Sequence, residues 1–272
     1  MICVLDCETI PDTELVRAHF GLEGEDEAVT QEAIAQYEVA TGSSFLPHPF
    51  HKIVAISAVF ANESENYGDF HKVGTFPGNS EEEILGEFLN YLNKSNPKLV
   101  TFNGRSFDLP LIFMRALRYN LTCPAYFETE NKNSRFSEKN GKSKSKWENY
   151  RSRYSERFHL DLMDVIGNFG AVRGLKLDTL CQMAGLPGKY DVSGDQVTEL
   201  FYRGQLQKIQ EYCESDVLNT YLLFLKYELL QGNIDQERYK EILKNMQPKL
   251  PVDKSYTPVF SQFIQKEIDG RH

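Results

Sequence analysis

The first ten residues of the chain, MICVLDCETI, place two carboxylates at the end of an apolar segment. Residues 2–9 predict a strand, because they include Ile, Val and Thr and because neither glycine nor proline occurs before Pro11. A period of two puts Asp6 and Glu8 on the same face of that strand. Burying unpaired charge is costly, so we expect a partner beside them, and basic side chains, a metal ion and water are all candidates.

Two later segments place further polar groups where they could join this pair. NGRSFDLP follows a short apolar segment and puts Asp108 at a predicted helix start, where aspartate suits the N-cap, with Asn103 five residues before it. EYCESD puts Tyr212 and Asp216 four residues apart on a long predicted helix, so the phenol and the carboxylate project from one face. That face is otherwise apolar, which makes Asp216 a candidate site residue, with a structural salt bridge as the alternative.

The elements that must position these residues are mainly strands in the first part of the chain and helices in the second. This order predicts an α/β fold around one mixed sheet. Ser80 and Glu83 form a capping box for a helix that Pro97 ends. Strands are predicted over 2–9, 52–62, 66–76 and 98–104, one or two helices over 12–41, and further helices from 80, from 108, and over 160–169, 176–184, 195–203, 205–231 and 235–247.

In order along the chain, D-x-E, N-x4-D and Y-x3-D resemble the three motifs of the DEDD-type 3′–5′ exonucleases, and Tyr212 is typical of their DEDDy branch. The DEDDh branch would have histidine at position 211, which is glutamate here. The wider segments HLDLMD and IQEYCESDVLNTY are similar to stand-alone bacterial exonucleases related to the proofreading domain of family-B DNA polymerases. The resemblance implies a ribonuclease-H-like fold, with a central mixed β-sheet flanked by helices. It also implies an exonuclease domain over 1–232 with a basic insertion at 120–157, and a C-terminal helix and tail over 233–272 that pack on the same domain.

The resemblance further implies a metal-dependent enzyme that hydrolyses phosphodiester bonds at nucleic-acid 3′ ends and releases nucleoside 5′-monophosphates, with DNA favoured over RNA. Two divalent ions, Mg²⁺ or Mn²⁺, about 4 Å apart would be its cofactors, and carboxylate oxygens suit both ions. Two other functions are kept as alternatives. One is a catalytically silent nucleic-acid-binding module of the same fold, and the other is a protein-interaction scaffold whose carboxylates form surface ion pairs.

Within such a two-ion site, each acidic residue has an expected role. Asp6 would bridge the ions, and Glu8 and Asp216 would complete the ion that activates water. Asp108 would hold the second ion through water. Tyr212 would orient the attacking water, because a phenol with a pKa near 10 is a poor general base. Clustered carboxylates repel one another without metal, so at least one of them should titrate unusually high.

Residues that contact the substrate are predicted from weaker signals. Thr9 and Ile10 follow Glu8 closely enough to line a terminal-nucleotide pocket, mainly on the strength of the family resemblance. Asn103 is predicted to contact the substrate near the scissile end. Phe107 could pack under the substrate, although a core position is the favoured interpretation.

Residues 131–157 form a basic segment in an otherwise acidic chain, with nine Lys/Arg against three Glu. Cations interleaved with aromatic side chains are typical of single-strand binding without sequence readout. A solvated loop that its aromatic residues anchor to the domain is an equally supported interpretation. The candidate substrate contacts in this segment are Lys142, Lys144, Lys146 and Trp147.

The segment HLDLMD, with His159, Asp161 and Asp164, contains residue types that bind metals. Capping and dipole stabilisation of a helix start explain the two aspartates more simply, and we favour that interpretation. The remaining histidines, which include His48 and His51, show no metal-ligand spacing.

The composition limits which binding partners and which cellular compartment we expect for this protein. A net charge of −9 argues against a protein that coats nucleic acid through bulk electrostatics, but not against local contacts with a few phosphates. No apolar segment approaches the ~20 residues of a membrane helix, and the five cysteines are scattered without a C-x-x-C pair. We therefore expect a cytoplasmic protein with reduced thiols and no membrane contact. Its partners would be a nucleic-acid 3′ end, above all single-stranded DNA, and, transiently, replication or repair proteins.

Overall fold

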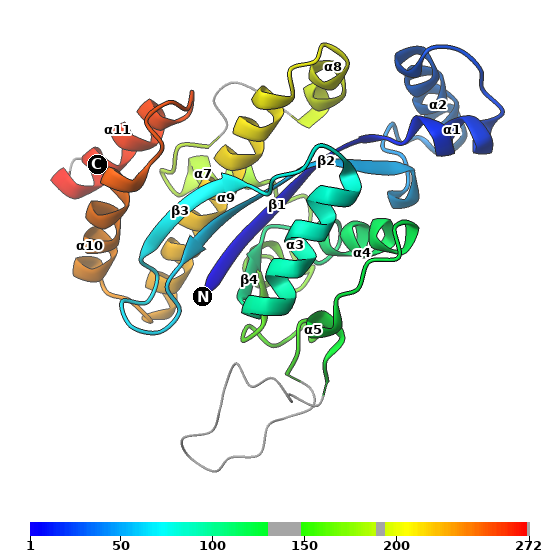
Figure 1. The fold of residues 1–272 in the computed structure, drawn as a ribbon. Coiled ribbons are helices and arrows are strands. Elements are labelled where there is room, and N and C mark those ends of the chain that lie inside the picture. Colours follow the sequence, from blue (N-terminus) through cyan, green and yellow to red (C-terminus); the bar gives the residue numbers. More distant parts are fainter. Residues whose placement is uncertain (130–147, 189–193, 271–272) are drawn as a thin grey trace.

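A computed structural model of the chain describes residues 1–129, 148–188 and 194–270. The strands are β1 (Ile2–Pro11), β2 (His51–Ala61), β3 (Phe70–Thr75), β4 (Lys98–Thr101) and β5 (His159–Asp161). They form one sheet in the order β3-β2-β1-β4-β5 (Figure 1). The pairs β1–β2 and β2–β3 are antiparallel, whereas β1–β4 and β4–β5 are parallel. This arrangement confirms the mixed sheet that the sequence predicts.

Helices cover both faces of this sheet (Figure 1). None of those within the three described ranges is long and apolar enough to cross a membrane. The helices are α1 (Thr13–Phe20), α2 (Asp26–Thr41), α3 (Glu81–Ser95), α4 (Asp108–Arg118), α5 (Pro124–Phe127), α6 (Leu162–Ile166), α7 (Leu177–Met183), α8 (Val197–Tyr202), α9 (Leu206–Gln231), α10 (Gln236–Met246) and α11 (Thr257–Asp269), with 3₁₀ turns η1 (His48–Phe50), η2 (Gly194–Gln196) and η3 (Gln247–Lys249).

The first half of β1 is buried on both faces, which explains why it is apolar throughout. Ile2 and Val4 pack into a core with α9, α10 and α11. Cys3 and Leu5 point the other way, into a second core with α3 and α4. A strand between two helical layers needs apolar side chains at every position. The carboxylates that follow in β1 therefore mark the end of this apolar packing.

The pairing of β1 with β4 stops early, so toward its carboxyl end β1 is paired with β2 and no longer with β4. Their parallel register runs from Ile2 opposite Lys98 to Val4 opposite Val100, whereas the pairing of β1 with β2 continues to Pro11. Beyond β4 the chain enters a loop and then begins α4. In open α/β sheets, ligands bind outside the carboxyl ends of the strands.

Two helices, α1 and α2, occupy the connection between β1 and β2 and lie beyond the carboxyl end of β1 (Figure 1). They enclose a small core that includes Val16, Val29 and Leu46. The predicted helical region that closes at Gly42 is confirmed. Gly42 is the C-cap of α2 with φ 76°, a left-handed conformation that glycine adopts without strain.

The strands predicted over 66–76 and 98–104 are shorter in the structure, where β3 begins at Phe70 and β4 ends at Thr101. Two further segments differ in the type of element. The helix predicted over 160–169 is instead β5 followed by α6, because three residues pair with β4 in a register that no local periodicity encodes. The predicted C-terminal helix and tail contain a second helix, α11. Pro258 lies in the first turn of α11, where a missing backbone N–H has no cost, so it begins a helix and does not prevent one.

Candidate active site

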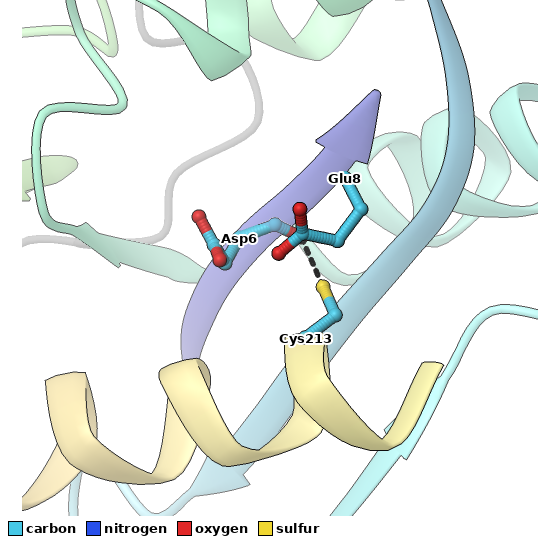
Figure 2. A group of neighbouring side chains, drawn as sticks. All are labelled: Asp6, Glu8 and Cys213. Atoms are coloured by element: carbon cyan, nitrogen blue, oxygen red, sulfur yellow. Dashed lines mark hydrogen bonds between the residues drawn. The ribbon is translucent and has the colours of Figure 1, made fainter. Parts of the chain in front are cut away.

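Asp6 and Glu8 both project from β1 toward α9 (Figure 2). One carboxylate oxygen of each and the sulfur of Cys213 all lie within 4.8 Å of one another. The alternation along β1 puts the two carboxylates on the face that Ile2 and Val4 begin, and the register with β2 shifts directly after Glu8. The two acidic residues that strand geometry predicts on one face are therefore close neighbours in the fold.

Cys213 belongs to this group as a packing residue. Its side chain is fully buried on α9, and its thiol donates to the backbone carbonyl of Asp6 at 3.5 Å (Figure 2). Burial first, and then the negative charges of Asp6 and Glu8, raise the pKa of this thiol well above its ordinary value. A thiol that keeps its proton is a poor ligand for a hard cation, so the carboxylate oxygens define the site.

Asp108 reaches the same region from the start of α4. It is the first residue of the helix, and the N-cap is Phe107, so the predicted capping role of Asp108 is wrong. Its Oδ1 instead accepts a hydrogen bond from the Cys7 amide at 3.1 Å, at a point where β1 is no longer paired with β4. The side chain is 3% exposed, and burial raises the pKa of the carboxyl to about 6. A contact between residues 101 positions apart thus replaces the expected local one.

Tyr212 and Asp216 enter from α9, and both are buried. The Tyr212 hydroxyl is hydrogen-bonded to Asp216, and burial followed by the charges of Asp216 and Glu8 raises its pKa far above the ordinary value. The pKa of Asp6 is also raised well above its usual range, first by burial and then by the negative charges of the other three carboxylates. This shift of the Asp6 pKa has the direction expected for clustered carboxyls, and their titration stays a prediction.

A buried glutamate that the sequence analysis did not identify helps to hold α9 in place. Glu214 accepts hydrogen bonds from the Thr75 hydroxyl at 3.1 Å and from the Tyr256 hydroxyl at 2.9 Å. The Lys254 ammonium lies 3.0 Å from the same carboxylate. β3 and the segment before α11 are therefore both attached to the helix turn that carries the candidate site residues.

Glu211 makes a second attachment of the same kind, because its carboxylate accepts a hydrogen bond from the Ser255 amide at 3.2 Å. Glu211 and Glu214 flank Tyr212 in the sequence. The signal that could have identified them is the one used for Asp216, an acidic residue within a helix whose other positions are largely apolar. The residues that pair with these two glutamates, in contrast, are not indicated by any pattern in their local sequence.

Asp161 organises the loop that precedes Asp108. It is the N-cap of α6 and accepts a hydrogen bond from the Met163 amide at 3.0 Å, which confirms the capping interpretation for Asp161. Asp164 lies in the first turn of α6 and forms ion pairs with Arg105 and Arg153. The Asp161 carboxylate also accepts from the backbone amides of Asn103 at 2.9 Å and Arg105 at 2.8 Å. The oxygens of Asp161 are thus occupied by backbone amides, and the residue positions the loop between β4 and α4.

Thr9 and Ile10 differ in their surroundings. Thr9 is partly exposed beside Glu8, and its hydroxyl lies 3.1 Å from Nδ1 of His51. Ile10 is buried in a core that includes Tyr212. Of these two residues, Thr9 is the one with surface available to a ligand, and the contact of either residue with a terminal nucleotide stays a prediction.

Asn103 and Phe107 lie in the loop before α4, and both are partly exposed. Asn103 has a left-handed backbone, with φ 68°. Phe107 packs against the rings of His48 and His51, at centroid distances of 5.1 and 5.7 Å, and against the core on the α4 side. The favoured core interpretation of Phe107 therefore has structural support, while substrate contact by either residue stays a prediction.

The basic segment is described only near its C-terminal end. Tyr150 is buried, and its hydroxyl lies 2.6 Å from the carbonyl of Pro97, just before β4, as the anchoring interpretation predicts. Tyr154, in contrast, is 78% exposed. The four candidate contacts lie outside the described residues, and their role stays a prediction: Lys142, Lys144, Lys146 and Trp147.

The carboxylates of the site form a donor set that suits a divalent cation. They provide oxygen atoms alone, the ligand type that hard ions such as Mg²⁺ and Mn²⁺ prefer. Burial and mutual repulsion raise the pKa of Asp6, and a bound cation would relieve that repulsion. The residues that could hold such an ion are Asp6, Glu8, Asp108 and Asp216.

Two comparisons with known proteins bear on this site. A protein family described as "predicted 3′–5′ exonuclease related to the exonuclease domain of PolB" matches residues 43–267. A DNA polymerase of Archaeoglobus fulgidus is 23% identical over 145 residues, which make up 53% of this chain and 17% of that polymerase. The family match includes Asp108, Tyr212 and Asp216 and begins after Asp6 and Glu8, so the first two carboxylates join the group on the geometry of β1.

Proposed function

Because the chain belongs to the family of predicted 3′–5′ exonucleases related to the exonuclease domain of PolB, we propose that it removes nucleotides from nucleic-acid 3′ ends as nucleoside 5′-monophosphates. The observation that carries the proposal is the convergence of four buried or partly buried carboxylates from β1, α4 and α9, close enough for their charges to act on Asp6. A structural ion pair would match each carboxylate with a cation of the protein. Here the charges that act most strongly on Asp6 are negative.

We propose that Asp6, Glu8, Asp108 and Asp216 hold two divalent ions, Mg²⁺ or Mn²⁺. Exonuclease domains of this kind generally use divalent metals. Such ions, when bound, supply a water nucleophile near neutral pH and stabilise charge on the departing 3′ oxygen. The contribution of the chain is to present the oxygen ligands from three elements whose own packing holds them in place.

The phenol of Tyr212 would orient the attacking water and keep its own proton. Burial and the charge of Asp216 raise the pKa of this hydroxyl, which makes it unsuitable as a general base. The hydrogen bond to Asp216 limits the directions in which the hydroxyl can point. Tyr212 is therefore proposed as a positioning group beside the nucleophile, with no role in proton abstraction.

A catalytically silent nucleic-acid-binding module of the same fold is the alternative. The presence of all four carboxylates and of Tyr212 favours an enzyme, because these negative charges would weaken binding to an anionic strand in the absence of metal. We favour single-stranded DNA as the substrate over RNA. Thr9, Asn103 and Phe107 are proposed to lie near its 3′ end.

The decisive test compares two D-x-E pairs of the same chain. DNA and RNA oligonucleotides labelled at either end are incubated with the protein in Mg²⁺, Mn²⁺ or EDTA. We expect stepwise shortening from the 3′ end that EDTA abolishes. Asp6→Asn and Glu8→Gln should each lower the rate by about a thousandfold or more, because a lost ligand removes several kcal/mol of transition-state stabilisation.

Glu14→Gln is the matched control, since Glu14 has the same D-x-E spacing but its side chain is 79% exposed. It should cleave like the wild-type protein. Binding of an oligonucleotide without any shortening in either metal would instead favour the silent module. Unchanged cleavage by Asp6→Asn would overturn the assignment of the site.

A further inference from the structure

A groove of about 750 Å³ runs along the edge of the sheet, between β3 and α3. β3 is the outermost strand on the side away from β5 (Figure 1). Residues 71–77, which include most of β3, form one wall. The other wall is a single face of α3, because its residues follow the helical repeat. These helix residues are Glu87, Asn90, Tyr91, Lys94 and Ser95.

Two residues of β3 direct their backbone groups out of the sheet. The Phe76 amide donates to the Ile56 carbonyl at 2.8 Å and continues the register in which Thr75 is opposite Ser57. In an antiparallel ladder such hydrogen-bonded pairs alternate with pairs whose amides and carbonyls face away from each other. Val73 and Thr75 belong to the second kind. On this outer side, no described backbone group pairs with the amide or the carbonyl of either residue.

The remainder of this edge is closed to pairing. At the start of β3, the Lys249 ammonium donates to the Phe70 carbonyl at 2.7 Å. Beyond the end of β3, Pro77 has no backbone N–H to donate. The open part of the edge is therefore short, and it is centred on Val73 and Thr75. A short open edge of this kind can accept one extended peptide as an additional strand.

Gly74, between these two residues, leaves space in the groove. Its φ is outside the left-handed region, so the local backbone does not require glycine. A Cβ added at this position would meet no heavy atom within 4 Å. Glycine inside a strand weakens the strand and often marks a place where another backbone approaches closely. The glycine at this position therefore suits the approach of a ligand.

The floor of the groove is aromatic, and its rings pack on one another. Phe60 meets Tyr91 edge-on with ring centroids 5.2 Å apart, and it meets Phe76 at 6.1 Å. The Lys72 ammonium lies over the Phe60 ring, 5.2 Å from its centroid. Bases of a single-stranded nucleic acid stack on free ring faces. Interlocked rings with a covered face instead suit the apolar side chains of a peptide.

Two exposed lysines lie toward the same end of the groove. Lys72 is opposite Phe60 in the β2–β3 register, and Lys94 follows Tyr91 by nearly one helical turn. Neither lysine forms an ion pair with another described residue. Glu87 is the single acidic residue among the described residues of the groove, and it lies one turn before Tyr91. In a chain of net charge −9, this local positive charge favours an acidic occupant.

We propose that the groove binds an extended acidic segment of a partner protein, which pairs with β3 as an additional strand. Apolar side chains of this segment pack against Phe60 and Phe76, and its carboxylates lie beside Lys72 and Lys94. A second copy of this chain is a poorer occupant, because its own edge would bring the same lysines toward these.

The inference goes beyond the proposed exonuclease function and does not depend on it. Asp6 and Glu8 project toward α9, whereas the groove lies on the side of α3 (Figure 2). The partner segment would therefore hold the protein without covering the candidate active site.

The test measures binding of a fluorescein-labelled peptide by fluorescence anisotropy. The peptide has about ten residues, enough to span residues 71–77 at roughly 3.3 Å per residue. Phenylalanine and valine alternate in its centre, and aspartates flank them. We expect saturable binding to the wild-type protein. The same peptide with lysines for aspartates, or with N-methyl groups on alternate backbone amides, should bind about tenfold or more weakly, because each change removes several of the expected contacts.

Variants of the groove separate binding from folding. Gly74→Val should weaken binding by about tenfold or more without lowering thermal stability, because valine suits a strand but fills the groove. Gly86→Ala is the matched control, since Gly86 also has open space at its Cβ and does not line the groove. It should bind like the wild-type protein. Lys72→Glu and Lys94→Glu should each weaken binding of the aspartate peptide by about three- to tenfold.

Backbone amide hydrogen exchange then locates the bound peptide. Exchange should slow at Val73 and Thr75, whose amides face outward, and stay unchanged at Gly74, whose amide faces β2. Absence of binding by the aspartate peptide, or equal binding to the wild-type protein and Gly74→Val, would overturn the inference.

Two further outcomes would replace the peptide by another occupant. A labelled oligothymidylate that binds the wild-type protein but not Gly74→Val would identify the groove as a nucleic-acid site. A dimer in sedimentation that Gly74→Val dissociates would identify it as a contact between copies of this chain. Either result would overturn the proposal of a partner peptide. Shortening of oligonucleotides by Gly74→Val at the wild-type rate would show that the groove and the proposed exonuclease function are independent.

Discussion

Tyr212 shares one turn of α9 with Asp216, and its hydroxyl lies among buried negative charges. Burial and these charges raise the pKa of the phenol, so it remains protonated at every pH at which the protein would act. A group that keeps its proton can hold a water molecule in line for attack, and it cannot take a proton from that water. The protonation state of this phenol, and with it the role of the side chain, depends on its surroundings.

Tyr212→Phe tests this role because it removes one oxygen and keeps the ring. We expect kcat to fall by about a hundredfold with little change in KM, the effect of losing a group that orients the nucleophile. Single-turnover cleavage of a 5′-labelled oligonucleotide would measure it. Tyr227→Phe is the matched control on the same helix. The Tyr227 hydroxyl donates a hydrogen bond to Glu156 at 2.9 Å and is not part of the candidate site. An undiminished kcat for Tyr212→Phe would contradict the role.

At the scale of elements, α9 is held from two sides. One side meets β1 and carries Tyr212 and Asp216, and the other is attached to the segment before α11 through Glu211 and Glu214. A site built from three elements requires that each of them keeps its position. The C-terminal segment therefore supports the site without contributing a residue to it.

Tyr256→Phe removes the hydroxyl that donates to Glu214. We expect the free energy of unfolding to fall by about 1–3 kcal/mol, because the lost hydrogen bond is to a buried charged group. Urea denaturation followed by circular dichroism would measure the loss. Tyr154→Phe, at a tyrosine 78% exposed, should leave the free energy of unfolding unchanged. Equal stability of the two variants would show that the attachment does not hold α9.

For the whole molecule, the candidate site is a source of instability in the absence of metal. Its carboxylates are buried near one another in a chain whose net charge is already −9. The folded state must either protonate some of them or bear the repulsion, whereas the unfolded chain exposes them to water. The stability of the fold is thereby linked to pH and to bound cations.

Asp108→Asn should reveal this link. The pKa of Asp108 is raised from 3.8 to about 6, so its contribution to stability is fully present below the unfolded pKa and is lost as the pH rises through the folded one. Without metal, the variant and the wild-type protein should be equally stable near pH 4, and the variant should be more stable at pH 7 by about 3 kcal/mol. Thermal or urea unfolding at both pH values measures the difference.

Addition of Mn²⁺ at pH 7 should reverse the order. The wild-type protein should gain more stability than the variant, because a cation that binds only the folded state stabilises it in proportion to its affinity. A wild-type protein that Mn²⁺ does not stabilise, and that is no less stable than the variant in EDTA, would argue against a metal site at these carboxylates.

Local sequence patterns were enough to predict which side chains leave an element in the same direction. Strand alternation puts Asp6 and Glu8 on one face, and helical spacing puts Tyr212 and Asp216 on one face. Both pairs are close in the sequence, so the periodicity of the strand or of the helix sets the relative direction of their side chains. For the same reason the mixed α/β class and most of the helices could be predicted.

The partners of those side chains, in contrast, depend on the tertiary fold. The hydrogen-bonded pairs are all at least 42 positions apart in the sequence. They are Asp108 with Cys7, Asp161 with Arg105, Thr9 with His51, and Glu214 with Tyr256. β5, too short to show a period, exists because β4 pairs with it. A residue's own neighbours do not encode such partners, because they depend on how the sheet and the helices pack together.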